Sequence, residues 1–160
     1  MIKIEAEELK KILEKHKLWL EGKGGERADL SFVDLRSADL RYADLRFANL
    51  SSAHLRYVDL RSADLRSADL SSADLSFADL RYVDLRFTDL RSANLRYANL
   101  LYSNLRYADL RFADLSFADL SSANLCYANL RSADLSLTDF RSANLRSVKM
   151  FNGWKLIKDE

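Results

Sequence analysis

The sequence predicts an all-β fold, in which the chain winds into a parallel β-helix behind an N-terminal α-helical cap. Three observations lead to this fold class. Every fifth residue from Leu30 to Met150 is large and apolar, with Leu at 23 of 25 positions. Pro is absent, and all 4 Gly lie outside this stretch. A period shorter than any ordinary supersecondary unit means that neighbouring repeats supply each other's core.

A period of five fits neither regular secondary structure. A step of five residues rotates a helical position by roughly 140°, so the Leu residues would be scattered around the whole helix. Side chains of a straight strand alternate with period two, so successive Leu residues would point to opposite faces. The chain must therefore bend once in every repeat.

Each repeat has five positions with distinct residue preferences. A small residue, Ala in 18 copies, stands two positions before the Leu, with Asp or Asn between them except at His54 and Lys149. After the Leu come a first corner position, mostly Arg or Ser, and a second corner position, mostly Ser, Tyr or Phe. Residues two apart share a face of an extended segment, so we expect the small residue and the Leu to point inward. The expected core includes Leu50, Leu70, Leu90, Leu110 and Leu130.

Three segments follow from this pattern. Residues 28–152 hold the 25 repeats, whose stacked coils would pair their backbones about 4.8 Å apart. Residues 1–27 read as an amphipathic helix with a Gly-rich turn, and the apolar stripe of that helix should cover the first coil. Residues 153–160 form a short tail, which with Phe151 brings an apolar cluster that closes the last coil in part or leaves it adhesive. The cap residues are Leu9, Ile12, Leu13 and Trp19.

Runs such as ADLRS, ADLSF and ANLRY resemble the pentapeptide-repeat family, and the resemblance covers all 25 repeats. It implies a right-handed quadrilateral β-helix with four pentapeptides in each coil, and hence about six coils. The outward residues show no period of twenty clear enough to support a fourfold cross-section on their own. The fourfold shape therefore comes from the resemblance alone.

Few residues are candidates for chemistry. His54 occupies an Asp/Asn position, and with four repeats in a coil it would stack between Asp34 and Asp74. Ligands in one flat column do not converge on a metal ion, so a surface substitution is favoured over a metal site. Cys126 stands at a first corner position without a His placed to activate it, and we expect an inert exposed thiol. The sequence predicts no enzyme, no catalytic or metal residue and no cofactor.

The outward corners are the candidate binding surface, since Tyr, Ser and Arg are residues that binding surfaces favour. The family resemblance includes DNA mimics that interact with topoisomerases, but 16 Asp against 15 Arg and Lys149 make these repeats neutral. The same neutrality disfavours nucleic-acid binding through Arg, Tyr and Phe columns. Stacking of the aromatic residues between coils is at least as good an explanation as a ligand. The candidate contact residues are Tyr42, Tyr57, Tyr82, Tyr97, Tyr102, Tyr107, Tyr127, Arg41, Arg81, Arg96 and Arg106.

The small set of residue types found at the corners indicates an engineered chain. Lys, Glu, Gln, Thr, Gly and Ile never occur at either corner in 25 copies, although exposure excludes few of them. Each position can be written as one degenerate codon, for example CGC or AGC for Arg or Ser. We therefore expect a synthetic consensus scaffold without catalytic activity whose corners are available for binding. The alternative is a protein-binding module, either selected from a library or inherited from natural relatives.

The sequence leaves partners and location open. No run of about 18 apolar residues and no basic-then-apolar leader occurs, so we expect neither a membrane span nor a secretory signal. A chain expressed in a cell would then be cytoplasmic. Open coil ends invite association, so we expect a monomer but keep an end-to-end dimer through the C-terminal coil as an alternative.

Overall fold

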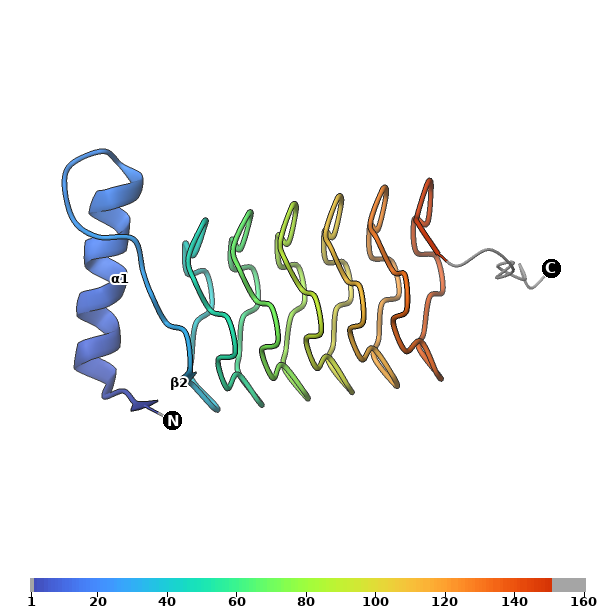
Figure 1. Ribbon diagram of the computed structural model, residues 1–160, viewed down its shortest axis with the longest axis horizontal. Helices are drawn as coiled ribbons and strands as arrows, with labels where there is room; N and C mark the ends of the chain where they lie inside the picture. The colour runs from blue at the N-terminus through green and yellow to red at the C-terminus, as the bar shows by residue number, and fades with distance from the viewer. Residues whose placement is uncertain (1, 151–160) are drawn as a thin grey trace.

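The computed structural model describes residues 2–150, and the chain coils around one axis over most of that length (Figure 1). Strand β1 (Ile2–Lys3) leads into helix α1 (Ala6–Leu20), which lies beside the first coil. Strand β2 (Val33–Asp34) belongs to the first coil and pairs with β1 in parallel. The sequence predicts the helix but not β1, which is too short to show a period.

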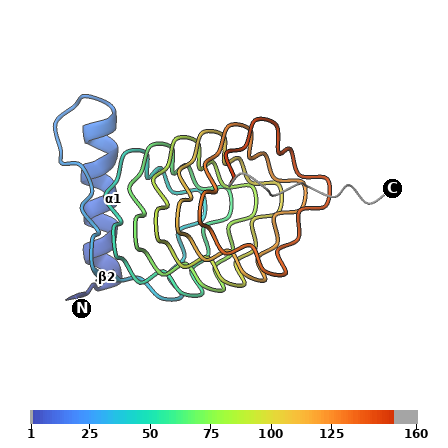
Figure 2. The same ribbon diagram turned by 45° about the vertical axis from the view of Figure 1, so that its right-hand side comes forward.

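The coils pair with a register of twenty residues. Asp39 bridges to Asp59, and Asp59 bridges to Asp79, always in parallel. Each coil therefore holds four five-residue repeats and has four faces, and Figure 2 shows the coils stacked along one axis. We name each face after its first Leu: the Leu30, Leu35, Leu40 and Leu45 faces. This observation supplies the fourfold cross-section that the outward residues alone do not.

Each corner is a hydrogen-bonded turn. The N–H of Ala38 donates to the carbonyl of Leu35 at 3.0 Å, which encloses the two corner residues Arg36 and Ser37. Ser37 has a φ of 57°, and all 24 second corner residues from Phe32 to Ser147 share this left-handed conformation. A positive φ at the third turn residue alone is the signature of a type II turn.

This backbone conformation corrects one step of the sequence interpretation. We treated both corner positions as sterically free, but a positive φ disfavours β-branched residues at the second one. The absence of Thr and Ile there needs no genetic explanation. Gly and Asn tolerate a positive φ well, so their absence from the second corner of the described coils stays unexplained by the backbone.

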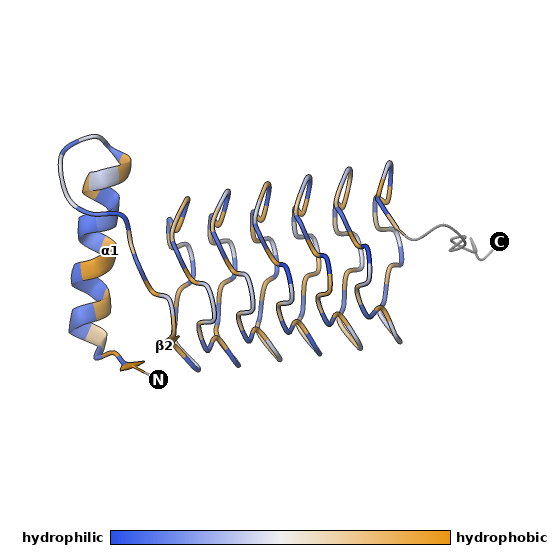
Figure 3. Cartoon of the chain, in the orientation of Figure 1, coloured by the Kyte–Doolittle hydropathy of each residue, from blue (hydrophilic) through white to orange (hydrophobic). Residues whose placement is uncertain are grey.

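The interior is apolar and continuous. Leu50, Leu70, Leu90 and Leu110 are at most 1% exposed, and Leu130 is 3% exposed, as the inward assignment requires. Apolar and polar residues alternate around every coil in Figure 3. Beyond Leu130 the inward Leu135, Phe140 and Leu145 become half-buried. The apolar tail residues that we expected beside them, residues 151–157, lie outside the described part of the chain.

Helix α1 is tied to the first coil at several points. Leu9, Ile12 and Leu13 pack against the apolar core, whereas Trp19 is 39% exposed and meets Phe47 edge-on. At the helix end the N–H of Lys23 donates to Leu18 and that of Gly22 to Trp19, the pattern of a Schellman motif. A Cβ at Gly25 would lie 2.2 Å from the Lys15 carbonyl, so only glycine lets the returning chain pass this close.

Candidate binding surface

The Asp and Asn side chains on the outer faces hold the corners in shape. Oδ1 of Asp59 accepts the backbone N–H of Arg61 at 3.2 Å, and Oδ1 of Asn94 accepts that of Arg96 at 3.1 Å. This bond satisfies a turn N–H that no neighbouring coil reaches. The carboxylates are therefore structural, and their number does not indicate catalysis.

Where an Arg stands two positions after an Asp, the two side chains form a bidentate ion pair. In the first of these pairs on the Leu40 face, Arg41 donates to both oxygens of Asp39 at 2.8 and 2.6 Å, and it lowers the pKa of that carboxyl to about 2. The pairs are exposed or half-buried, so solvent screens them and each adds little stability. The paired residues are Arg36, Arg41, Arg46, Arg61, Arg66, Arg81, Arg86, Arg91, Arg111 and Arg141.

The remaining repeat arginines stand two positions after a residue that has no carboxylate. Arg56 follows His54, and four others follow Asn. Within residues 2–150 none of them forms an ion pair, and three lie over aromatic rings instead. The Arg96 guanidinium is 5.0 Å from the Tyr97 ring centroid, for example. The four that follow Asn are Arg96, Arg106, Arg131 and Arg146.

Aromatic second corner residues stack into columns along the coil axis. The Leu35 ladder consists of Tyr57, Phe77, Tyr97 and Phe117, with ring centroids 5.1, 4.9 and 4.7 Å apart. The Leu45 ladder consists of Phe87, Tyr107 and Tyr127, with nearly parallel rings 5.0 Å apart. Tyr82 and Tyr102 form a shorter stack at 5.3 Å. The rings bury much of their apolar surface against one another.

The structure therefore sorts the candidate contact residues into separate groups. Tyr57 and Tyr97 share one ladder, Tyr107 and Tyr127 share another, and Tyr42 stands apart at 77% exposure. Arg41 and Arg81 are neutralised by Asp39 and Asp79, whereas Arg96 and Arg106 lie over rings. Our candidate set missed the phenylalanines that join the tyrosines. The twenty-residue register would have found them, since it places aromatic residues at 57, 77, 97 and 117.

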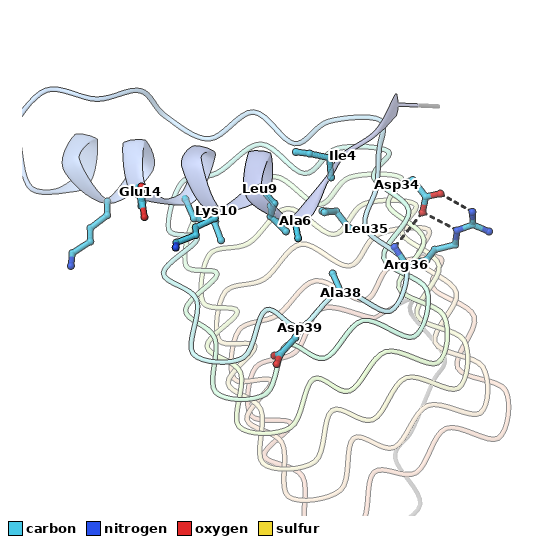
Figure 4. A pocket seen from close by; sticks show the side chains of 12 residues that line it. Ile4, Ala6, Leu9, Lys10, Glu14, Asp34, Leu35, Arg36, Ala38 and Asp39 are labelled. Carbon is cyan, nitrogen blue, oxygen red and sulfur yellow. Dashed lines mark hydrogen bonds and ion pairs between the residues drawn. The ribbon is translucent and has the colours of Figure 1, made fainter.

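A cavity of about 610 Å³ lies between α1 and the first coil (Figure 4). Leu9, Leu35 and Ala38 line its apolar part, and the Asp34–Arg36 pair lies at its edge. The cavity arises because α1 leaves part of the first coil uncovered, which keeps Ala38 half-buried. Of its charged lining residues, Asp34 pairs with Arg36, and Asp39 pairs with Arg41 outside the cavity.

A family model described as pentapeptide repeats matches residues 28–67, 68–100, 103–141 and 118–152, in 8 copies. The chain belongs to the pentapeptide-repeat family. Proteins of this family form right-handed quadrilateral β-helices and are generally structural or binding proteins. A comparison with curated protein sequences found no match.

Solved pentapeptide-repeat proteins resemble this one. A protein of the Arabidopsis thaliana thylakoid lumen is 30% identical, with 60% of this chain and 67% of that chain covered and a TM-score of 0.59. Full-length QnrB1, described as a plasmid-mediated fluoroquinolone resistance protein, is 24% identical, with coverages of 82% and 70% and a TM-score of 0.50. HetL of Nostoc sp. strain PCC 7120, described as involved in heterocyst differentiation regulation, is 38% identical, with coverages of 79% and 69% and a TM-score of 0.34.

Two single residues complete the description of this pentapeptide-repeat surface. His54 bridges to Asp34 and Asp74 in its column, as its position predicts. Among the described residues no cluster of three possible ligands could hold a metal ion. Cys126 is 7% exposed, so our expectation of an exposed thiol is wrong. No helix within residues 2–150 is long and apolar enough to span a membrane.

Proposed function

We propose that this pentapeptide-repeat protein is a non-catalytic structural scaffold whose outward corners form the surface available for binding. One observation carries the proposal: most outward Asp, Asn and Arg side chains, and the rings of the ladders, are bonded or stacked within their own repeat or column. Asp59 holds both the backbone and the guanidinium of Arg61, and Tyr97 stacks between Phe77 and Phe117. A catalytic site instead needs groups that converge on a shared substrate position.

Removing rings from one ladder tests the scaffold role. Tyr57→Ser with Tyr97→Ser deletes two members of the Leu35 ladder and inserts a residue that already occurs at this position. Cross-strand aromatic pairs contribute roughly 0.2–1 kcal/mol each, so a scaffold should stay folded and lose about 1–3 kcal/mol of unfolding free energy. Tyr82→Ser with Tyr102→Ser is the matched control on another corner. Loss of the folded state in either variant would contradict the proposal.

A protein-binding module is the second candidate. The Leu35 ladder is an unbroken strip of four rings, each at least 39% exposed, and Leu137 continues it at 77% exposure. Exposed apolar strips of this kind mark contact surfaces. In a binder, the Tyr57→Ser, Tyr97→Ser variant loses a protein captured by the unmodified chain, and the Leu40-face control keeps it. A DNA-mimic role is less well supported, because the Asp–Arg pairs neutralise most of the carboxylates.

We propose further that the chain is of synthetic origin. The support is the corner palette, of which the positive φ accounts for the missing β-branched residues only. Sequencing the gene tests this point directly. Degenerate-type triplets at equivalent positions are expected, and mixed natural codon usage would overturn the proposal.

The association state is a separate proposal. We favour a monomer over an end-to-end dimer through the C-terminal coil, where Leu135, Phe140 and Leu145 are half-buried. Light scattering of the full chain should give the mass of a single chain, 18.4 kDa. A doubled mass that falls on changing Phe140 to Ser would support the dimer instead.

A further inference from the structure

The C-terminal part of the Leu45 face differs from the rest of the surface in its charge. In the N-terminal coils this face carries Asp44, Asp64 and Asp84, each bound to the Arg of its own repeat. At the next three steps of twenty the same column holds Asn104, Asn124 and Asn144. Asn supplies the same turn-holding oxygen without the charge, as its bond to the Arg106 N–H at 3.3 Å shows.

The loss of carboxylates leaves cations uncompensated. Arg106 and Arg146 stand in this column, and within the described residues neither forms an ion pair. Around the corner, the Leu30 face continues the pattern with Asn129, Lys149 and Arg131. We call Arg106, Arg131, Arg146 and Lys149 the basic edge. Arg131, Arg146 and Lys149 are exposed, and Arg106 is half-buried.

Two carboxylates near the basic edge are already paired with arginines, whereas Asp134 on the adjacent Leu35 face is bonded to Ser136. Asp109, one coil before Asn129, is bound to Arg111 at 2.6 Å, and Asp139 is bound to Arg141 at 2.6 Å. Both carboxylates are thus already paired with a cation of their own repeat. On the Leu45 and Leu30 faces of the last described coils, the basic edge therefore meets no unpaired carboxylate, although the repeats as a whole are neutral.

An aromatic ring face lies beside these cations. Tyr127 is the last ring of the Leu45 ladder, stacked on Tyr107 at 5.0 Å and 41% exposed. The following position in the column is Ser147, so no ring of the described residues covers the other face of Tyr127. The backbone N–H of Tyr127 donates to the carbonyl of Arg146 at 3.0 Å, so the repeat that carries Arg146 lies directly beside the repeat of Tyr127 in the next coil.

We infer that the basic edge binds single-stranded nucleic acid, with phosphates on the arginines and Lys149 and a base stacked on Tyr127. Coils about 4.8 Å apart place Arg106 and Arg146 about 10 Å apart, within reach of successive phosphates of one strand. A ring face that no described residue stacks on favours a nucleobase over the carboxylates of an acidic protein. The inference concerns a surface separate from the Leu35 ladder and does not depend on the proposed scaffold role.

The direct test restores the missing carboxylates. Asn104→Asp with Asn144→Asp recreates the Asp–Arg pair that ten other repeats contain, so the variant should fold as well as the unmodified chain. Binding of a fluorescent oligothymidylate is followed by anisotropy at low salt. We expect affinity to fall about tenfold or more, and the unmodified chain to show a salt slope of about 2–3, as three or four phosphate contacts require.

A matched control carries the same charge change elsewhere. Asn94→Asp with Asn99→Asp adds two carboxylates to the Leu35 and Leu40 faces and should leave the affinity within about twofold. Equal losses in both variants, or no loss in the first, would overturn the inference.

Tyr127→Ser distinguishes a nucleic acid from other polyanions. It should weaken binding of oligothymidylate while leaving binding of inorganic polyphosphate unchanged, because only the former has bases. If poly-glutamate binds more tightly than oligothymidylate and Tyr127→Ser affects neither, the basic edge serves an acidic protein segment and our inference is wrong.

Discussion

At the scale of single residues, the small inward position shows which buried hydroxyl groups have a hydrogen-bond partner. Thr88 and Thr138 carry hydroxyls there, and each donates to a carbonyl of the preceding coil at 2.8 Å. Ser103 occupies the same position with 1% exposure, and its hydroxyl has no partner among the described residues. A buried hydroxyl without a hydrogen bond costs about 1–3 kcal/mol.

Ser103→Ala should therefore stabilise the fold. Ala occurs at this position in 18 repeats and removes the unsatisfied hydroxyl without leaving a large void. We expect the unfolding free energy in urea to rise by about 1 kcal/mol. Thr88→Val is the control: it removes a hydroxyl that is bonded, and it should destabilise. A loss of stability in Ser103→Ala would show that the hydroxyl has a partner after all.

The second corner position gives a prediction about backbone strain. Ser92 has a φ of 56° and an exposed side chain, so packing contributes little there. We expect Ser92→Val to cost about 1 kcal/mol or more, since a β-branched side chain clashes in this region. Ser92→Gly relieves the strain but raises the conformational entropy of the unfolded chain. Its unfolding free energy should therefore stay within about 1 kcal/mol of that of the parent. Equal melting temperatures for Val and Gly would contradict the turn assignment.

The residue scale also shows what sequence reasoning reaches. The inward Leu and Ala positions follow from periodicity alone, because a period of five leaves only one arrangement that buries them. The φ of Ser92 does not follow, since Ser, Tyr and Phe carry no preference that marks a left-handed residue as Gly would. Arg56 shows a second limit of sequence reasoning. Among the described residues it forms no ion pair, because His54, and not an Asp, stands two positions before it.

At the scale of elements, α1 joins the first coil through a buried histidine. His16 is 0% exposed, stacks on Trp19 at 5.7 Å, and accepts the Ala28 N–H through Nδ1 at 3.1 Å. This bond requires a neutral imidazole, since a protonated Nδ1 has no lone pair to offer. Burial lowers the pKa of His16, the Arg46 backbone and the Asp44 carboxylate raise it, and the charges of Arg27 and Arg46 lower it further.

The depressed pKa predicts a pH-dependent junction. A histidine whose folded pKa lies below its unfolded value of 6.5 binds fewer protons in the folded state. Its contribution to the unfolding free energy is complete above pH 6.5. That contribution is lost as the pH falls, by up to about 1.4 kcal/mol per pH unit. We expect the unfolding free energy to fall between pH 7 and pH 5.5. His16→Gln should flatten this dependence, and His54→Asn, which lies outside the junction of α1 with the first coil, should not.

The helix also shows how far element boundaries could be anticipated. Gly22 marks the end of α1 in the sequence, and the Schellman bonds to Trp19 and Leu18 agree with it. Strand β1 leaves no comparable signal, because pairing of Ile2 with Val33 depends on where α1 places the N-terminus. The sequence predicts that aromatic residues stack between coils, but it does not say which ones, because the partner of Tyr57 stands twenty residues away and needs the coil register.

At the scale of the whole molecule, each coil contacts only its neighbours, so position along the axis should set the cost of a core change. Leu90 lies mid-stack and is 0% exposed, whereas Leu145 lies in the last described coil and is half-buried. We expect Leu90→Ala to cost about 2–5 kcal/mol and Leu145→Ala clearly less. Chemical denaturation of both variants measures the difference. Equal costs would mean that the coils do not behave as a stack.

The central claim is that twenty residues make one coil, and distances between spin labels test it most directly. In a Cys126→Ser background, cysteines for labels replace Ser52 and Ser132, Ser62 and Ser142, or Ser67 and Ser147, which lie on three different corners. Each pair spans four steps of the register, so all three distances should be about 19 Å, with the same small offset from the labels. Three clearly different distances would contradict the fourfold coil and the surface built on it.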